Sequence, residues 1–263
     1  MIAQHLKKLP GTRETSILVL AYLYLPILVL IGYSFNANRS ATVWTEFSFA
    51  WYGKIVVNPS IQAAAFNSLV VAGFATVLST AIALAAALAT SRPFYGRRLV
   101  EGGINLPLIL PEIVIAVATL LLFMSLGIKL GLMTVIVAHV GFCIPFAYLP
   151  IRARLNDLDK SLLEAAGDLY ASPYQVFRRV TLPLLWPAVL SGAVLAFVVS
   201  LDDFIMTFFV AGPGSTTLPV YIFSAIKAGV TPEINAISTL MLVISIVLVV
   251  LSYWLGQRGK PDA

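Results

Sequence analysis

Six long apolar runs constrain this chain more than any other feature of its sequence. They cover residues 16–35, 66–90, 104–126, 132–151, 186–211 and 234–255. A helix needs about 20 predominantly apolar residues to cross the roughly 30 Å hydrocarbon core of a bilayer, and each run meets that length. We therefore predict an all-α integral membrane protein with six transmembrane helices, organised as a single domain over residues 1–263.

Composition supports a membrane protein over a soluble one. Of the 263 residues, 59% are hydrophobic and only 11% are charged, and the mean hydropathy is +0.93. An ordinary soluble domain carries about twice that share of charged residues. The first apolar run is also longer than the roughly 7 to 15 apolar residues of a secretory signal, so we expect it to be a retained span.

The basic residues predict the orientation of the chain. Thirteen of the 17 would face the cytoplasm if the N-terminus does, and the four outside would be Arg39, Lys54, Lys129 and Lys227. Cytoplasmic loops of membrane proteins carry an excess of Lys and Arg, so we predict a bacterial inner-membrane protein with both termini in the cytoplasm. The same charges are scattered over loops rather than gathered on one face, which argues against nucleic-acid binding.

The loop between the fourth and fifth spans, residues 152–185, contains two helix-start patterns. Ser161 with Glu164, and Ser172 with Gln175, each have the spacing of a capping box, and Pro173 fits the first helical position. We predict two short cytoplasmic helices that end before Pro183. By periodicity alone they could dock on a soluble partner or rest on lipid headgroups.

Resemblance to a known family favours docking. The run Glu164, Ala165 and Ala166, followed by Ala171 and Ser172 and then by "RRVTLPLLWPA", resembles the EAA signature of permease subunits in bacterial ATP-binding cassette importers. In that family the loop forms coupling helices that dock on a separate ATPase. The resemblance assigns ATPase coupling to Ser161, Glu164, Ala165, Ala166, Gly167, Ser172, Leu182 and Pro183.

The likeness extends over nearly the whole chain, through "YLPILVLIGYSFN", "AHVGFCIPFAYL" and "SLDDFIMTFFVAGPGSTTLPVYIF". These pieces look most like permeases of the spermidine/putrescine type. The resemblance implies a subunit that forms half of a translocation pathway for polyamines. It also implies a second homologous permease, an ATPase dimer that binds ATP and Mg²⁺, a substrate-binding protein outside, and no cofactor on this chain.

One position departs from the family pattern. Tyr170 stands where glycine is usual, and Gly167 stands where a helix former is usual. Glycine adopts the left-handed conformation at a helix end freely, whereas another residue there costs about 1 to 2 kcal/mol. We expect the first coupling helix to be looser than in relatives, or to end differently.

ATP chemistry is not expected on this chain. The glycine-rich piece "AGPGSTTLP" lacks the lysine of a phosphate-binding loop and follows a span rather than a strand. The sequence also offers no metal-ligand cluster and no nucleophile paired with a base. We therefore predict a subunit that is not an enzyme.

Three acidic residues lie inside predicted spans, and no lysine or arginine lies there with them: Glu112, Asp202 and Asp203. An ionisable group at membrane depth costs about 2.5 to 3.5 kcal/mol, so it normally marks a pathway. The missing partner would be a cationic substrate. At about 1.5 Å per residue the positions predict two separate stations, one for Glu112 and one for the aspartates. The alternative is that these carboxyl groups are protonated and hydrogen-bonded between helices.

Neighbouring positions refine this hypothesis. Asp202 and Asp203 differ by about 100° around a helix, so only one is expected to face the pathway while the other bonds to a neighbouring helix. Pro107 and Pro111 are expected to bend the third span beside Glu112. His139, alone in the fourth span, is more typical of a hydrogen-bonded core residue than of a relay.

The best interpretation is an importer permease for polyamines. These carboxylates suit diamines and longer amines alike, and other small solutes are an open alternative. A proton-coupled secondary transporter is less favoured, because such carriers often contain an internal repeat, which this sequence lacks.

Overall fold

Helices account for the secondary structure of the part of the chain that the structure describes, which is residues 11–39, 43–229 and 231–257 of a computed structural model. The only β pairing described there is an isolated bridge between Asn36 and Phe47. The helices, in chain order, are α2 (Thr12–Tyr33), α3 (Ala50–Val57), α4 (Pro59–Thr90), α5 (Arg97–Ile109), α6 (Glu112–Ser125), α7 (Leu132–Asn156), α8 (Lys160–Asp168), α9 (Pro173–Val176), the π-helical turn η1 (Phe177–Thr181), α10 (Leu182–Asp202), α11 (Ile205–Val210), α12 (Leu218–Ala228) and α13 (Pro232–Gln257).

Five continuous helices are long and apolar enough to cross a membrane. They are α2, α4, α7, α13 and the helix that runs through α9, η1 and α10. The remaining predicted span, 104–126, is the pair α5 and α6, which meet at a bend of 112°. An all-α membrane protein with up to six spans is therefore confirmed, although two of the predicted spans are broken helices.

The chain divides into two compact units. The first comprises residues 1–58 and 222–242, and the second comprises residues 59–221 and 243–263. In the first unit α2 leads into an aromatic cluster in which the rings of Phe35, Phe47, Phe49 and Tyr52 contact one another. The Trp51 indole donates to the Asn36 carbonyl at 2.7 Å and closes this segment.

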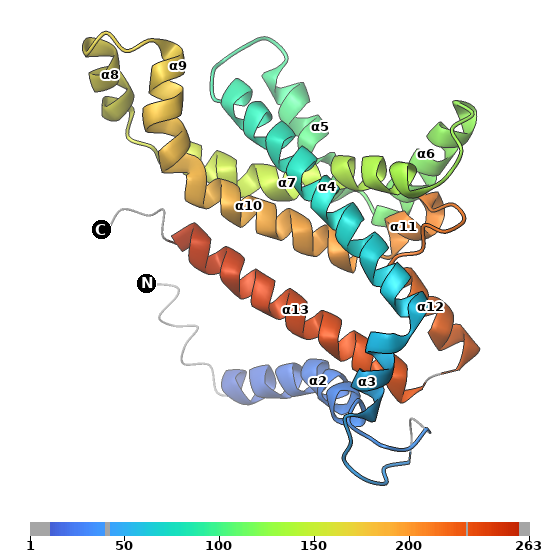
Figure 1. Cartoon of the computed structure of the whole chain (residues 1–263). Helices are drawn as coiled ribbons and strands as arrows, with labels where there is room; N and C mark the ends of the chain where they lie inside the picture. The colour runs from blue at the N-terminus through green and yellow to red at the C-terminus, as the bar shows by residue number, and fades with distance from the viewer. Residues whose placement is uncertain (1–10, 40–42, 230, 258–263) are drawn as a thin grey trace. The chain divides into compact units, whose positions relative to one another are not determined.

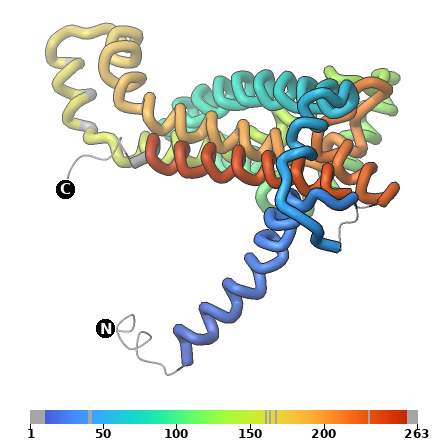
Figure 2. The backbone as a smooth tube through the Cα atoms, turned by 60° about the horizontal axis from the view of Figure 1, so that its bottom comes forward, coloured from blue at the N-terminus to red at the C-terminus, as the bar shows by residue number. Residues whose placement is uncertain are grey.

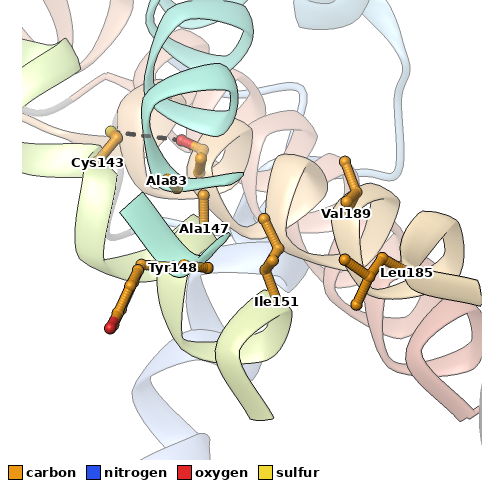
Figure 3. Close-up of a cluster of buried hydrophobic side chains, with 9 residues drawn as sticks. Ala83, Cys143, Ala147, Tyr148, Ile151, Leu185 and Val189 are labelled. Atoms are coloured by element: carbon orange, nitrogen blue, oxygen red, sulfur yellow. Dashed lines mark hydrogen bonds between the residues drawn. The ribbon is translucent and has the colours of Figure 1, made fainter. Parts of the chain in front are cut away.

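The second unit is built on α4, α7 and α10, which lie side by side (Figure 1; Figure 2). Small residues make this packing close, because alanine, serine and glycine let helix backbones approach in a membrane protein. Figure 3 shows one of its two apolar clusters, where Ala83 of α4, Ala147 and Ile151 of α7, and Leu185 and Val189 of α10 meet. A second cluster joins α4, α6, α7 and α11.

Gly192 marks a close approach of α10 to α7. A Cβ atom added there would lie 2.8 Å from the Ala147 carbonyl oxygen, closer than real Cβ contacts allow. The two backbones are therefore in contact at this level, and glycine is required.

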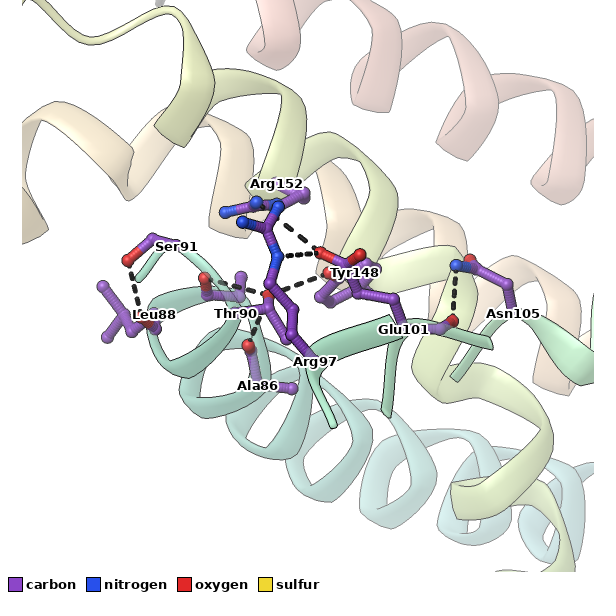
Figure 4. A network of polar contacts seen from close by, with 10 residues as sticks. Ala86, Leu88, Thr90, Ser91, Arg97, Glu101, Asn105, Tyr148 and Arg152 are labelled. Atoms are coloured by element: carbon purple, nitrogen blue, oxygen red, sulfur yellow. Dashed lines mark hydrogen bonds and ion pairs between the residues drawn. The ribbon is translucent and has the colours of Figure 1, made fainter. Parts of the chain in front are cut away.

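A polar network ties the end of α4 to α5 and α7 (Figure 4). The Glu101 carboxylate accepts from Arg97 Nε at 3.0 Å and lies 3.6 Å from Arg152 Nη2. The hydroxyl groups of Thr90 and Tyr148 are 2.9 Å apart, which adds a buried link between α4 and α7. These charged groups cluster at the same end of α4 and α7, which is the end predicted to be cytoplasmic.

Candidate functional site

Two helix breaks in the second unit bring acidic residues together. The first break is at Leu110 and Pro111, whose backbones are extended, and Glu112 begins α6 directly after it. The second is at Asp203, where the backbone leaves α10 before α11 begins at Ile205. Because α6 packs on α11, the two breaks lie against each other. Broken helices of this kind form substrate and ion sites in many transporters.

Proline accounts for the first break. Pro111 has no N–H to bond within a helix, and its ring disfavours the helical conformation of the residue before it. The predicted bend is confirmed at Pro111, whereas Pro107 remains inside α5. The predicted fifth span is wrong beyond Asp202, because the chain turns at Asp203 instead of continuing to residue 211.

The Asp203 carboxylate is buried, with 7% of the residue exposed, and it caps the short helix α11. Oδ1 accepts from the Met206 N–H at 3.2 Å, and Oδ2 accepts from the Thr207 N–H at 3.0 Å. The Thr207 hydroxyl also donates to Oδ2 at 3.2 Å. A carboxylate at a helix N-terminus satisfies amides that have no partner in the helix and is stabilised by the helix dipole.

His139 of α7 reaches the same carboxylate. Its Nε2 lies 3.0 Å from Asp203 Oδ2 and 2.9 Å from Thr207 Oγ1, and its Nδ1 lies 2.8 Å from Ser200 Oγ. The residue is 1% exposed, so both ring nitrogens are bonded within the protein. The expectation of a hydrogen-bonded core histidine is therefore confirmed by geometry.

Glu112 completes the cluster. Its carboxyl group is half-buried and lies beside the Asp203 carboxyl group, where α6 packs on α11. The prediction of two separate stations for Glu112 and Asp203 is wrong: the bend at Pro111 places α6 against α11, and the two carboxyl groups form one site.

Asp202 faces a different way from its neighbour. It is exposed, and its Oδ1 accepts from the Ser245 hydroxyl of α13 at 2.9 Å. The expected divergence of the two aspartates is therefore observed, with Asp203 turned into the protein and Asp202 turned onto α13. Within the described residues, none of the three carboxyl groups pairs with a lysine or arginine.

The line from Ser200 through His139 to Asp203 superficially resembles a hydrolase triad. Ser200 is 4% exposed and lies on the inner face of α10, whose backbone amides bond within the helix. A substrate carbonyl therefore has neither access to the hydroxyl nor an oxyanion donor beside it. Within the described part of the chain, no three metal-ligating side chains gather into a cluster either.

The loop between α7 and α10 is the second predicted functional region, and its first cap differs from the prediction. The helix α8 begins at Lys160, and Asp159 Oδ1 accepts from the Ser161 N–H at 2.9 Å. This hydrogen bond holds the pKa of Asp159 below its ordinary value. The cap is therefore Asp159, and the capping box predicted for Ser161 and Glu164 is wrong, since the helix starts before Ser161.

The second capping box is confirmed. Ser172 Oγ accepts from the Gln175 N–H at 3.4 Å, and Gln175 Oε1 accepts from the Ser172 N–H at 2.8 Å. The helix that follows does not end before Pro183, as predicted. It continues through the π-helical turn η1 into α10, because the extra residue of a π turn moves the preceding carbonyls away from the proline ring. Leu182 and Pro183 thus begin the span itself.

Tyr170 ends α8 in the left-handed conformation, with φ of +57°. The Ala171 N–H reaches back to the Ala166 carbonyl at 3.2 Å, which is the long bond of a Schellman motif with Tyr170 in the position that glycine usually holds. The predicted strain at Tyr170 is therefore present, and Gly167 lies within α8 as expected.

The surface of this loop is apolar where a partner could reach it. Leu169 is 81% exposed and Tyr170 is 97% exposed, and Tyr174 is largely exposed as well. A hollow of about 430 Å³ lies between α8 and α9, and its lining includes Ala166 and Val176. Glu164 and Ala165 are exposed on α8. We refer to this surface, over residues 160–176, as the α8–α9 surface.

Sequence reasoning missed four residues of these sites. Ser200 and Thr207 hold His139, Ser245 holds Asp202, and Asp159 caps α8. Asp159 could have been found, because an aspartate directly before a helical pattern is a cap signal. The partners of His139 and Asp202 lie 43 to 68 positions away in sequence, so no local pattern indicates them.

Comparison with known proteins gives the arrangement a family. Residues 79–261 match the family described as "Binding-protein-dependent transport system inner membrane component". The chain belongs to this family. It is 44% identical to the spermidine/putrescine transport system permease protein PotC of Haemophilus influenzae, over 92% of this chain and 95% of that protein. It is 38% identical to the putrescine transport system permease protein PotI of Escherichia coli K12, over 92% and 89%.

The fold has solved counterparts. A chain in the crystal structure of a bacterial alginate ABC transporter, in complex with an alginate pentasaccharide-bound periplasmic protein, superposes with a TM-score of 0.71 at 18% identity. The match covers 95% of this chain and 94% of that chain. The helical architecture described above is therefore that of the membrane subunits of binding-protein-dependent importers, and this permease is an inner-membrane component.

Proposed function

We propose that this chain is the permease subunit of an ATP-driven polyamine importer and forms half of its translocation pathway. The observation that carries the proposal is the 44% identity, over nearly the whole chain, to a permease named for spermidine and putrescine transport. The likeness to a permease named for putrescine supports the same substrate class.

The acidic site has the chemistry that such a substrate requires. Polyamines carry ammonium groups, and an ammonium group loses its hydration when it enters a low-dielectric interior. Glu112, Asp202 and Asp203 offer carboxyl oxygens there, and they lie at or beside helix breaks without a basic partner among the described residues. We assign direct contact with the amine to Glu112 and Asp202, which are partly exposed or exposed, and assign the support of Glu112 to Asp203.

The α8–α9 surface is proposed to dock on the ATPase. It presents exposed apolar side chains beside the small residues Ala165 and Ala166, a composition that suits a hydrophobic groove in a partner. The continuous helix through η1 connects this surface to the break at Asp203. Movement of the ATPase would thereby reach the acidic site along one helix.

The remaining partners follow from the same assignment. This chain would pair with a second homologous permease, two ATPase copies that bind ATP and Mg²⁺, and a substrate-binding protein on the outer side. Both termini would be cytoplasmic, and the chain itself would carry out no catalysis. An importer for another small solute uses the same architecture and is distinguished only by the substrate.

One observation favours a second candidate. The neighbouring carboxyl groups of Glu112 and Asp203, of which Asp203 contacts His139, could also bind a proton in a secondary transporter. ATP dependence separates the two functions, because a secondary transporter works on a proton gradient alone.

Uptake by right-side-out vesicles or proteoliposomes that contain the full complex, with ATP enclosed, tests the proposal. We expect binding-protein-delivered, ATP-dependent accumulation of labelled putrescine or spermidine, and its loss when this subunit is omitted. The matched control is the same preparation with a dissipated proton gradient, which should retain uptake. Uptake by this chain alone, or uptake abolished by loss of the gradient with ATP present, would overturn the proposal.

A further inference from the structure

One imidazole connects three helices at the second break. His139 projects from α7 and bonds to Ser200, which lies in α10 before the break, and to Thr207, which lies in α11 after it. Asp203, in the break itself, is 3.0 Å from the same Nε2 atom. The ring therefore contacts the helix before the break, the break and the helix after it.

The hydrogen-bond partners of the two ring nitrogens give the nitrogens different roles. Nε2 faces a carboxylate oxygen, which only accepts, so Nε2 carries the hydrogen that is donated. Nδ1 faces the Ser200 hydroxyl, which can donate or accept and so imposes no charge requirement. The Nε2 contact is thus the one that orients Asp203, and the Nδ1 contact orients the ring.

Orientation of Asp203 matters because three other donors fix the same carboxylate. The Met206 amide, the Thr207 amide and the Thr207 hydroxyl hold it from α11, and the Glu112 carboxyl group of α6 lies beside it. Without the Nε2 donor, the carboxylate is held by the short helix α11 alone and is free to turn with it. Glu112 would then lose its fixed position at the surface that the substrate reaches.

We propose that His139 is a positioning residue for the amine site: its Nε2–H fixes Asp203 at the break between α10 and α11 and, through Asp203, fixes the carboxyl group of Glu112. The inference rests on the proposed function for its effect on uptake, and on geometry alone for its effect on α11. His139 itself does not contact the amine.

Two substitutions separate the two nitrogens. In His139→Gln the side-chain amide reaches the position of Nε2 and keeps a donor for Asp203, whereas in His139→Asn it reaches only the position of Nδ1 and keeps the bond to Ser200. A third variant, Tyr148→Phe, removes the buried hydroxyl contact between α7 and α4 without touching the break, and serves as the control for loss of a buried hydrogen bond.

The first measurement is amine uptake by the full transporter over a range of concentrations, at matched subunit abundance. We expect His139→Asn to raise KM about tenfold, the effect of one hydrogen bond to a charged group, with a smaller change in Vmax. His139→Gln and Tyr148→Phe should leave KM within about twofold of the original. Equal KM values for the Asn and Gln variants would overturn the proposal, because a role in packing does not distinguish the two nitrogens.

The second measurement does not depend on transport. Hydrogen–deuterium exchange of the purified full complex should show faster exchange over residues 204–210 in His139→Asn than in His139→Gln. Unchanged exchange there in both variants would overturn the proposal that His139 positions Asp203. If Glu112→Gln and Asp202→Asn instead leave uptake normal while exchange responds as expected, the amine site is refuted. The positioning of Asp203 by His139 is then still supported.

Discussion

The acidic site and the α8–α9 surface lie at opposite ends of the helix that runs through η1 and α10. They differ in how far their side chains are buried. At the breaks, Asp203 and His139 are almost fully buried and every bonding atom of their side chains has a partner inside the chain. On the α8–α9 surface, Leu169 and Tyr170 are exposed and Tyr170 holds a strained backbone. The buried side chains of the first region find their partners within the chain, whereas the second region exposes apolar side chains that the proposed ATPase contact would cover.

This contrast indicates where a substitution acts. A change at the breaks removes bonds that nothing else replaces, so it affects folding and substrate binding together. If this surface docks on the ATPase as proposed, a change there should leave the isolated subunit intact and act only in the assembled transporter. The predictions below test that division, beginning with the largest effect.

Asp203→Asn should have the largest effect. The new amide presents an NH₂ group where two backbone amides and His139 all donate, so at least one donor loses its acceptor in a buried place. Breaking a buried ionic arrangement costs about 3 to 5 kcal/mol. We expect a loss of uptake on the order of a hundredfold, together with a fall in abundance and melting temperature of the purified complex.

Asp202→Asn is the matched control one residue away. Its single described partner, the Ser245 hydroxyl, can donate to an amide oxygen as well as to a carboxylate. Abundance should therefore stay normal, and KM for the amine should rise about tenfold through loss of the charge. If both variants show the same loss of abundance, the distinction between a buried and a substrate-facing aspartate is wrong.

Ala165→Asp tests the other end of the helix. The residue is exposed on α8, so an aspartate fits the isolated subunit, yet it places a charge in the surface proposed to dock. We expect roughly a tenfold reduction of uptake and of substrate-stimulated ATPase activity, with normal membrane insertion. Glu164→Lys should act in the same direction. Full ATPase stoichiometry with normal uptake in either variant would contradict the docking assignment.

Much of the fold was predictable because the length of each apolar run is a property of the sequence itself. The runs at 16–35, 66–90, 132–151 and 234–255 correspond to helices, and Pro111 predicted the first break. The second break was not predictable in this way. No proline lies near Asp203, and the turn there depends on a side chain that caps α11 and on His139 from another helix.

The candidate site shows the same division. Glu112, Asp202 and Asp203 stood out because charge is rare in apolar spans, but their grouping did not follow from counting residues along straight helices. The bend of 112° between α5 and α6 invalidates that count and brings Glu112 to Asp203. On the α8–α9 surface, the cap at Ser172 followed from local spacing, and the strain at Tyr170 followed from the missing glycine.

Asp159→Ala should have a small effect confined to α8. Removing an N-cap side chain costs about 1 kcal/mol, so we expect exchange of the amides of residues 161–168 to quicken roughly fivefold at neutral pH. Asp159→Asn keeps a capping oxygen and should behave like the original protein, and Ser161→Ala should be neutral because the hydroxyl is not the cap. A larger effect of Ser161→Ala than of Asp159→Ala would show that Ser161, and not Asp159, caps α8.

Tyr170→Gly should have the smallest effect and the opposite sign. Glycine adopts a φ of +57° without strain, which favours the end of α8 by about 1 kcal/mol, and its greater freedom in the unfolded chain offsets part of that gain. We expect slightly slower exchange over residues 161–171 and uptake within about twofold of the original.

The Tyr170→Gly variant also separates backbone strain from partner contact, because it removes an exposed ring from the α8–α9 surface. Tyr170→Ala removes the same ring and keeps most of the strain. Reduced uptake in both variants would assign the ring to the ATPase contact, whereas reduced uptake in Tyr170→Ala alone would show that relief of the strain in Tyr170→Gly offsets the loss of the ring.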